Sequence, residues 1–194
     1  MHPFHFYLEL GFKHISDFAA YDHMLFLVAL CAIYRIEQWR KILILVTAFT
    51  IGHSVTLILA SFDIVTIPSK IIEFLIPVTI FLTAINNVVG SNAETKTAKM
   101  NKNYAIALIF GLIHGMGFSN YFKALLMDAS TVTVPLLGFN IGIELGQLIV
   151  VFAIVGIAYI FLNLLNVKHR DWNVFVSGAA AGISILFMIE NKFW

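Results

Sequence analysis

The stretch "PLLGFNIGIELGQLIVVFAIVGIAYIFLN", residues 135–163, decides the fold class of this chain. It exceeds the roughly 20 apolar residues that a helix needs to cross a bilayer, and Glu144 is its only charged residue. Pro135 stands at its start, where a helix tolerates a missing N–H. Residues 135–163 therefore predict a transmembrane helix that tilts or extends beyond the bilayer.

The rest of the chain has the same character, because 60% of its 194 residues are hydrophobic and only 12% are charged. A soluble domain has about a quarter charged residues. Five more apolar runs qualify as spans, at residues 17–35, 41–61, 69–89, 104–122 and 174–190. Ser16 and Asp17 fit the start of the first of these helices. The sequence thus predicts an all-α polytopic membrane protein: one integral-membrane domain, residues 1–194, with six transmembrane helices and room for a short outer N-terminal helix.

Basic residues in the loops indicate the orientation of these spans. The connections after the first, third and fifth spans hold eight of the 12 basic residues, namely Arg35, Arg40, Lys41, Lys96, Lys99, Lys102, Lys168 and Arg170. The positive-inside rule places these connections in the cytoplasm and both termini on the outer side. The net charge of +1 gives no reason to expect nucleic acid as a partner. The lipid bilayer is the expected surrounding, and a homo-oligomer is compatible with the sequence.

Ionisable and amide side chains inside the spans are candidates for function, because charged groups are costly in a membrane. Counting about 1.5 Å per residue from the outer ends places them about 8–14 Å deep, in one layer shared by four helices. The layer contains Asp22, His23, His53, His114, Asn140 and Glu144. The inner halves of the spans are nearly free of charge. The sequence therefore predicts an outward-facing cavity that apolar packing closes below.

Histidines and carboxylates in one layer suit a divalent transition metal such as Zn, Ni or Co. His23, His53 and His114 are the expected imidazole ligands, with Asp22 and Glu144 supplying negative charge. Other polar groups nearby are expected to support them: Thr50 and Thr56 flank His53 and fit as acceptors for its ring N–H, while Asn140, Gln147, Ser54 and Glu73 fit around the other ligands. The competing interpretation is that these groups only hold helices together.

Glycines at four-residue spacing predict where helices approach closely. Gly138, Gly142 and Gly146 share one face of the fifth span, opposite Glu144. The same spacing relates Gly111 to Gly115 in the fourth span, and Gly178 to Gly182 in the sixth; the sixth span, without a buried ionisable residue, is interpreted as scaffold.

Four segments together resemble the HupE/UreJ family of bacterial membrane proteins: "GFKHISDFAAYDHMLFL", "TAFTIGHSVTL", "IFGLIHGMGFS" and "GFNIGIELGQL". The resemblance implies a nickel or cobalt permease of the bacterial inner membrane, so the outer side, where the basic residues place both termini, is expected to be the periplasm. It also implies site roles for His14, Asp22, His23, His114 and Glu144. The gap between His14 and Asp22 is longer here than in the hydrogenase-linked members.

Three hypotheses of function are therefore compared. The first is binding and transport of a Ni/Co-type ion. The second is a membrane-embedded metal-dependent hydrolase, acting from the periplasmic side on a lipid or a membrane-associated peptide, with Glu144 or Asp22 as general base. Ser54 is a poor nucleophile candidate, because neighbours in a helix point about 100° apart, which turns it away from His53. The third hypothesis is a non-catalytic metal sensor or assembly partner.

Overall fold

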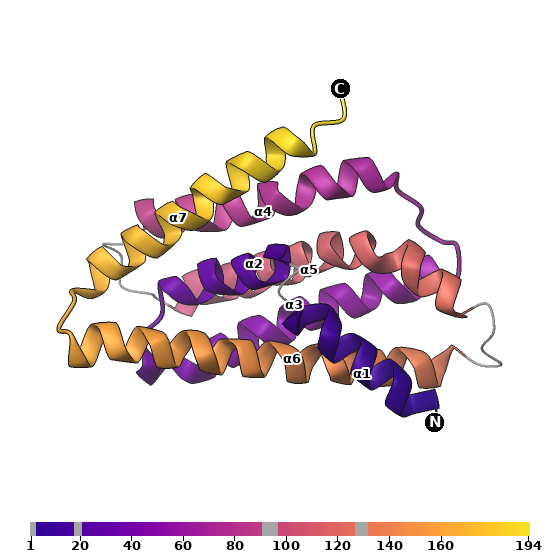
Figure 1. Cartoon of the computed structure of the whole chain (residues 1–194), viewed down its shortest axis with the longest axis horizontal. Coiled ribbons are helices and arrows are strands. Elements are labelled where there is room, and N and C mark those ends of the chain that lie inside the picture. The colour runs from indigo at the N-terminus through magenta and orange to yellow at the C-terminus, as the bar shows by residue number, and fades with distance from the viewer. Residues whose placement is uncertain (1–2, 18–20, 91–96, 127–131) are drawn as a thin grey trace.

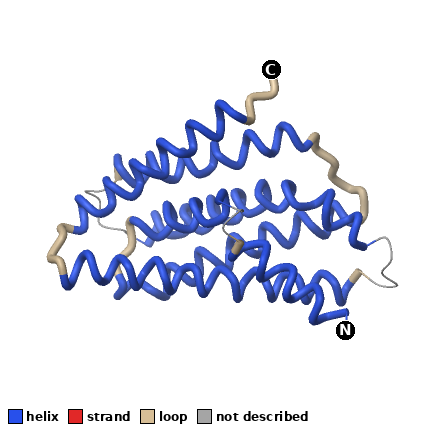
Figure 2. Tube along the Cα trace, viewed as in Figure 1, coloured by secondary structure: helices blue, strands red, loops and turns tan. Residues whose placement is uncertain are grey.

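The computed structural model describes residues 3–17, 21–90, 97–126 and 132–194. These residues form seven α-helices and no strand, which confirms the all-α class. The helices are α1 (Pro3–Ser16), α2 (Tyr21–Ala32), α3 (Trp39–Ser61), α4 (Ser69–Val89), α5 (Thr97–Leu126), α6 (Thr133–Tyr159) and α7 (His169–Glu190), with a 3-10 turn at Ile36–Gln38 and a π-helical turn at Ile160–Leu164. Figure 2 shows how little of the chain lies outside them.

Five of these helices are long and apolar enough to cross a membrane, and α1 and α2 together pass the same test as a pair bent by 65°. The predicted span 69–89 coincides with α4. The predicted first span, 17–35, differs, because its helix begins only at Tyr21, and a separate helix precedes it. Residues 18–20 of that span lie outside the described residues. Ser16 does not cap a following helix, since its hydroxyl donates to the Phe12 carbonyl (2.8 Å) within the last turn of α1.

The bundle is built from helix pairs that lie side by side (Figure 1). Helix α1 runs along α6, α3 runs along α5, and α4 runs along α7. Helix α2 lies between them and contacts α4, α6 and α7. Both chain ends lie toward the same end of the long axis as the α3–α4 connection (Figure 1). The short α2 therefore packs among longer helices, and its third residue, His23, is buried inside the bundle.

Glycines allow two of these pairs to approach closely, as the sequence predicted. A Cβ atom on Gly142 would overlap the Leu8 carbonyl of α1, and one on Gly111 would overlap the Phe49 carbonyl of α3. Small residues let helix backbones meet in a bilayer, where lipid gives no hydrophobic drive for association. Gly178 and Gly182 differ, because nothing lies within 4 Å of a Cβ added to either. Their spacing serves no close contact within the described residues.

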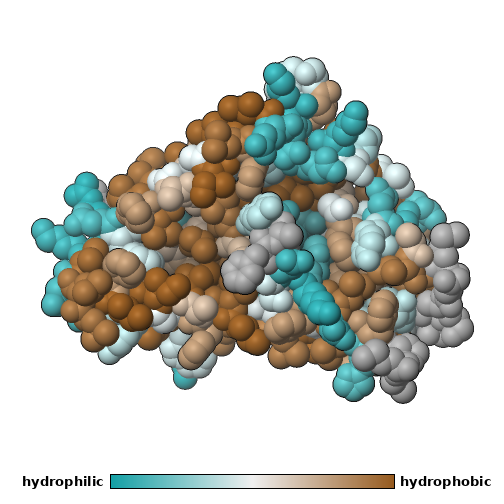
Figure 3. Space-filling model, in the orientation of Figure 1, coloured by the Kyte–Doolittle hydropathy of each residue, from teal (hydrophilic) through white to brown (hydrophobic). Residues whose placement is uncertain are grey.

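The surface matches the membrane interpretation. Hydrophobic side chains cover the flanks of the long helices, and hydrophilic ones gather toward their ends and along α1 (Figure 3). Large apolar residues such as Phe152 and Val89 are 82% and 80% exposed. Apolar exposure on this scale indicates contact with lipid, because soluble proteins rarely expose large contiguous apolar patches.

Candidate metal site

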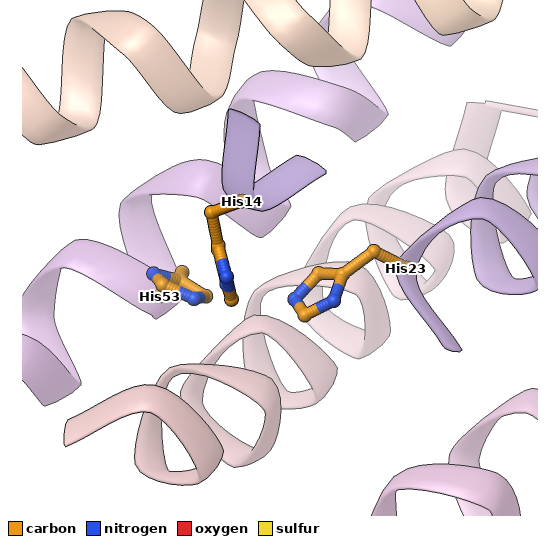
Figure 4. Close-up of side chains that lie close together, drawn as sticks. All are labelled: His14, His23 and His53. Atoms are coloured by element: carbon orange, nitrogen blue, oxygen red, sulfur yellow. The ribbon is translucent and has the colours of Figure 1, made fainter. Parts of the chain in front are cut away.

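Three histidines from three helices meet inside the bundle. His14 lies in the last turn of α1, His23 lies in the first turn of α2, and His53 lies toward the middle of α3. Each offers one ring nitrogen, and the three nitrogens lie within 4.8 Å of one another. Figure 4 shows the rings turned toward a common point. His23 and His53 are buried, at 4% and 0% exposure.

Four ring nitrogens of this cluster lack hydrogen-bond partners among the described residues. Nε2 of His14, Nε2 of His23 and both nitrogens of His53 are buried without a partner among the described residues. Leaving a buried polar atom unpaired costs free energy, so native structures pair nearly all of them. Neutral imidazole nitrogen is a common ligand of divalent transition metals. A metal ion held by these three rings fits the donor set and would satisfy one unpaired nitrogen on each ring.

Asp22 orients one of the three rings. Its Oδ1 accepts from Nδ1 of His23 at 3.0 Å and from the His23 backbone N–H at 2.8 Å. With the proton on Nδ1, the lone pair of His23 is on Nε2, which is the unpaired nitrogen. A carboxylate behind a histidine is the usual support for a metal ligand, because it fixes the tautomer and makes the imidazole more basic. Asp22 therefore acts through His23.

His114 of α5 borders the cluster, with its ring centroid 5.2 Å from that of His23. Thr79 of α4 lies 3.0 Å from Nε2 of His114, and its hydroxyl donates to the Ile76 carbonyl at 2.7 Å. The hydroxyl has only one proton, so it accepts from Nε2–H of His114. The lone pair of His114 is then on Nδ1, which is also buried and unpaired.

The close helix contacts place these histidines. Gly115, the residue after His114, lies against the backbone of His53, so α3 and α5 carry their histidines to the same depth. Gly11, one turn before His14, lies against the backbone of Phe139 in α6. Any side chain at Gly11 or Gly115 would push a histidine-bearing helix outward, because the contact is with backbone atoms that cannot move aside.

Thr50 and Thr56, which the sequence predicted as hydrogen-bond acceptors for His53, form hydrogen bonds to other groups. Thr50 donates to Oε1 of Gln147 at 2.6 Å, and Thr56 donates to the Leu112 carbonyl at 2.8 Å. Neither partners His53, because both hydroxyls hold α3 to its neighbouring helices. Ser54 likewise donates to the Thr50 carbonyl, at 2.7 Å.

Glu144 lies apart from the three rings. Its Oε1 accepts from Thr47 at 2.7 Å, and its Oε2 has no partner among the described residues. Thr47 precedes His53 by about 9 Å along α3. Helices α3 and α6 cross there, with Thr50 and Gln147 as the next contact. The sequence predicted Glu144 in the same layer as His53, and in the structure its hydrogen-bond partner is Thr47 of α3.

Other predicted residues fall around the site. Asn140 is half-buried, with its Oδ1 unpaired among the described atoms. Glu73 is exposed on α4 and shares a cavity with Asp22. Two residues of the site could not be identified from the predicted spans alone. His14 lies before the predicted first span and entered only through the family resemblance. Thr79 gave no signal, since a threonine in an apolar helix usually bonds its own backbone.

The fold and this cluster define a class: a polytopic helical membrane protein with a histidine site that could hold a metal ion. A family model described as HupE / UreJ protein matches residues 1–191, and the chain belongs to this family. Searches of curated proteins and of solved structures each return no match. The family suggests a membrane function related to nickel or cobalt transport.

Proposed function

We propose that the chain is a permease for a divalent transition metal of the Ni/Co type, built as one integral-membrane domain. His14, His23 and His53 would bind the ion, and His114 would join or stabilise the site. One observation carries the proposal: inside a membrane bundle, three histidine rings, two buried and one half-buried, each bring one nitrogen within 4.8 Å of the others, and each ring has a buried nitrogen without a partner among the described residues. A purely structural role would leave those nitrogens unsatisfied.

Cavities on both sides of the histidines support transport. One, of about 300 Å³, reaches Asp22 from the end of the bundle where α4 begins. The other, of about 220 Å³, lies toward the opposite end and is lined in part by Thr83, Asn86 and Asn103. As the sequence predicted for the inner halves, no charged residue among those described lines it, but these three polar side chains from two helices meet there in the fold. A carrier needs access to its site from both sides.

An aromatic pair separates the second cavity from the histidines. Phe26 stacks on Phe49 with centroids 4.7 Å apart, and both rings contact the His114 ring, at 5.2 and 5.1 Å. Phe26 also lines the second cavity. The arrangement supports a carrier closed on this side by two phenylalanines, which would rearrange to release the ion.

The hydrolase alternative has less support. Asp22 is engaged with His23, and Glu144 is engaged with Thr47 away from the three rings. Neither carboxylate is thereby placed as a free general base beside the histidines. We further propose that the protein lies in the bacterial inner membrane with its basic connections in the cytoplasm. The cavity at Asp22 would then face the periplasm.

Uptake by proteoliposomes tests this function. Purified protein is reconstituted, and entrapped Co²⁺ or Ni²⁺ is followed over time in vesicles with the wild type or His53→Leu. We expect uptake by the wild type and only the empty-vesicle rate with His53→Leu. His5→Leu is the matched control, because His5 is an exposed residue of α1. Normal metal binding without uptake above empty vesicles would overturn transport.

A further inference from the structure

The cavity that reaches Asp22 is acidic. It lies between the start of α2, the first turns of α4 and the end of α7, with a volume of about 300 Å³. Its charged lining residues are Asp22, Glu73 and Glu190, and Pro77 and Phe187 form part of its apolar wall. Because all of its charged lining groups are carboxylates, the cavity attracts cations.

Two of these carboxylates are free to meet an ion. Glu73 and Glu190 are exposed, and neither forms an ion pair within the part of the chain that the structure describes. The third, Asp22, keeps 34% of its side chain exposed while bonding to His23. The cavity thus presents negative charge from its mouth to its floor.

The floor of the cavity is joined to the histidine cluster. Oδ1 of Asp22 holds Nδ1 of His23 at 3.0 Å, and the His23 side chain is only 5% exposed. The other ring nitrogen of His23, Nε2, is buried and has no partner in the part of the chain that the structure describes. Asp22 is therefore shared: one carboxylate lines the open cavity and also orients a ring of the proposed site.

Aromatic rings wall the cluster elsewhere. Phe118 and Phe139 stack with centroids 4.9 Å apart and an interplanar angle of 7°, and Phe118 lies 4.1 Å from the His14 ring. Phe26 and Phe49 cover the side toward the second cavity. Apolar rings offer an ion nothing to replace its water. The side at Asp22 is the polar approach.

We propose that this acidic cavity is the access route by which a divalent cation reaches the histidines. Glu73 and Glu190 attract the hydrated ion at the mouth, and Asp22 receives it beside His23. The inference rests on the proposed function, because it assumes that the histidines bind the ion. It adds the route, between α2, α4 and α7, and two residues that act on the rate of arrival.

Binding kinetics test the route. Full-length protein in detergent is mixed with Co²⁺, and the absorption of the bound ion is followed at low and high salt. Charges along an approach mainly change the association rate and its salt dependence. For the double variant Glu73→Gln/Glu190→Gln we expect a low-salt association rate lower by about 3–10-fold, a weaker salt dependence and unchanged stoichiometry at saturation.

The control is Glu9→Gln/Glu37→Gln, which removes the same charge from an exposed residue of α1 and an exposed residue between α2 and α3. Its association rate should equal that of the wild type. Wild-type rates and salt dependence in Glu73→Gln/Glu190→Gln would overturn the route and leave the histidine site standing. Absence of binding in the wild type, or normal binding in His53→Leu, would overturn both proposals.

Covalent blockage gives a second readout. In a Cys31→Ala background, Glu73→Cys or Glu190→Cys is modified with a bulky, membrane-impermeant thiol reagent. Cys31 is the chain's single cysteine, and it is buried. We expect modification at either position to slow Co²⁺ binding by at least about 10-fold if the route passes there, as reduced access lowers the association rate. Unchanged binding after complete modification would contradict the route.

Discussion

The bundle contains two buried polar clusters that differ in how their atoms are paired. In the amide cluster, Nδ2 of Asn87 donates to the Ala29 carbonyl at 2.6 Å, and Nδ2 of Asn173 donates to the Asn87 carbonyl at 3.0 Å. Ser177 donates to Oδ1 of Asn173 at 3.0 Å. In the histidine cluster, both nitrogens of His53 are unpaired among the described residues.

The contrast distinguishes a cluster whose hydrogen bonds join helices from the cluster proposed to bind a metal ion. Ala29 lies in the last turn of α2, where carbonyls lose their helical partners, and Asn87 of α4 supplies a donor. Asn173 and Ser177 add α7 to the same network. No side-chain atom of that network is among the buried atoms without a partner in the described part of the chain, whereas four ring nitrogens of His14, His23 and His53 are. The difference in pairing agrees with a structural role for the amide cluster and with the proposed ligand role for the histidines.

The largest expected effect is on metal binding by His53→Leu. This variant removes one of three ring ligands and keeps a similar volume. Affinity for Co²⁺ should fall by more than about 100-fold, since loss of a mere supporting group already costs about 10–100-fold. Thermal stability without metal should not fall, because an unpaired buried imidazole is replaced by an apolar group. Titration measures the affinity, and unfolding curves of the same sample measure the stability. Normal affinity in His53→Leu would contradict a binding role for the unpaired histidine cluster.

Asp22→Asn should have the next largest effect. The amide keeps the size of the side chain but no longer gives His23 an anionic partner. We expect affinity to fall by about 10–100-fold with the stoichiometry at saturation unchanged. Asp171→Asn is a control, because Asp171 is exposed in the first turn of α7. Isothermal titration measures the affinity of both variants, with about two-fold taken as the resolution of the comparison. An affinity of Asp22→Asn within that range of the wild type would mean that Asp22 does not support His23 as a ligand.

Asn87→Leu is the converse of His53→Leu, with the same residue introduced into the paired cluster. It leaves the Ala29 carbonyl without its donor. We expect a loss of about 0.5–2 kcal/mol of stability, the range for interhelical hydrogen bonds in membranes, and unchanged metal stoichiometry. Unfolding in mixed micelles measures the first and metal analysis the second. Full stability in this variant would mean that pairing does not identify a structural cluster.

Helix positions were largely readable from the sequence, and the exception has a local cause. Span 69–89 follows Pro68 and carries no charge beyond Lys70 and Glu73, so its limits were clear. Ser16 followed by Asp17 resembles a helix start, and the hydroxyl instead bonds back to Phe12. Composition cannot show that α1 enters the bundle, because its place depends on Gly11 meeting the backbone of α6.

Part of the candidate site could be predicted from the sequence. His23 and His53 are costly in apolar helices, so the sequence marks them, and the structure brings both into one cluster. The place of Glu144 beside Thr47 depends on how α3 crosses α6, which no spacing records. The polar lining of the second cavity likewise depends on which helices are neighbours, since Asn86 and Asn103 belong to different spans.

X-ray absorption of the purified protein loaded with one equivalent of Co²⁺ or Ni²⁺ tests the central claim most directly. We predict a first shell containing at least three imidazole nitrogens, with the outer-shell scattering typical of histidine rings, and loss of one ring in His53→Leu. A shell of oxygen atoms only, or a spectrum that does not change in His53→Leu, would contradict the account.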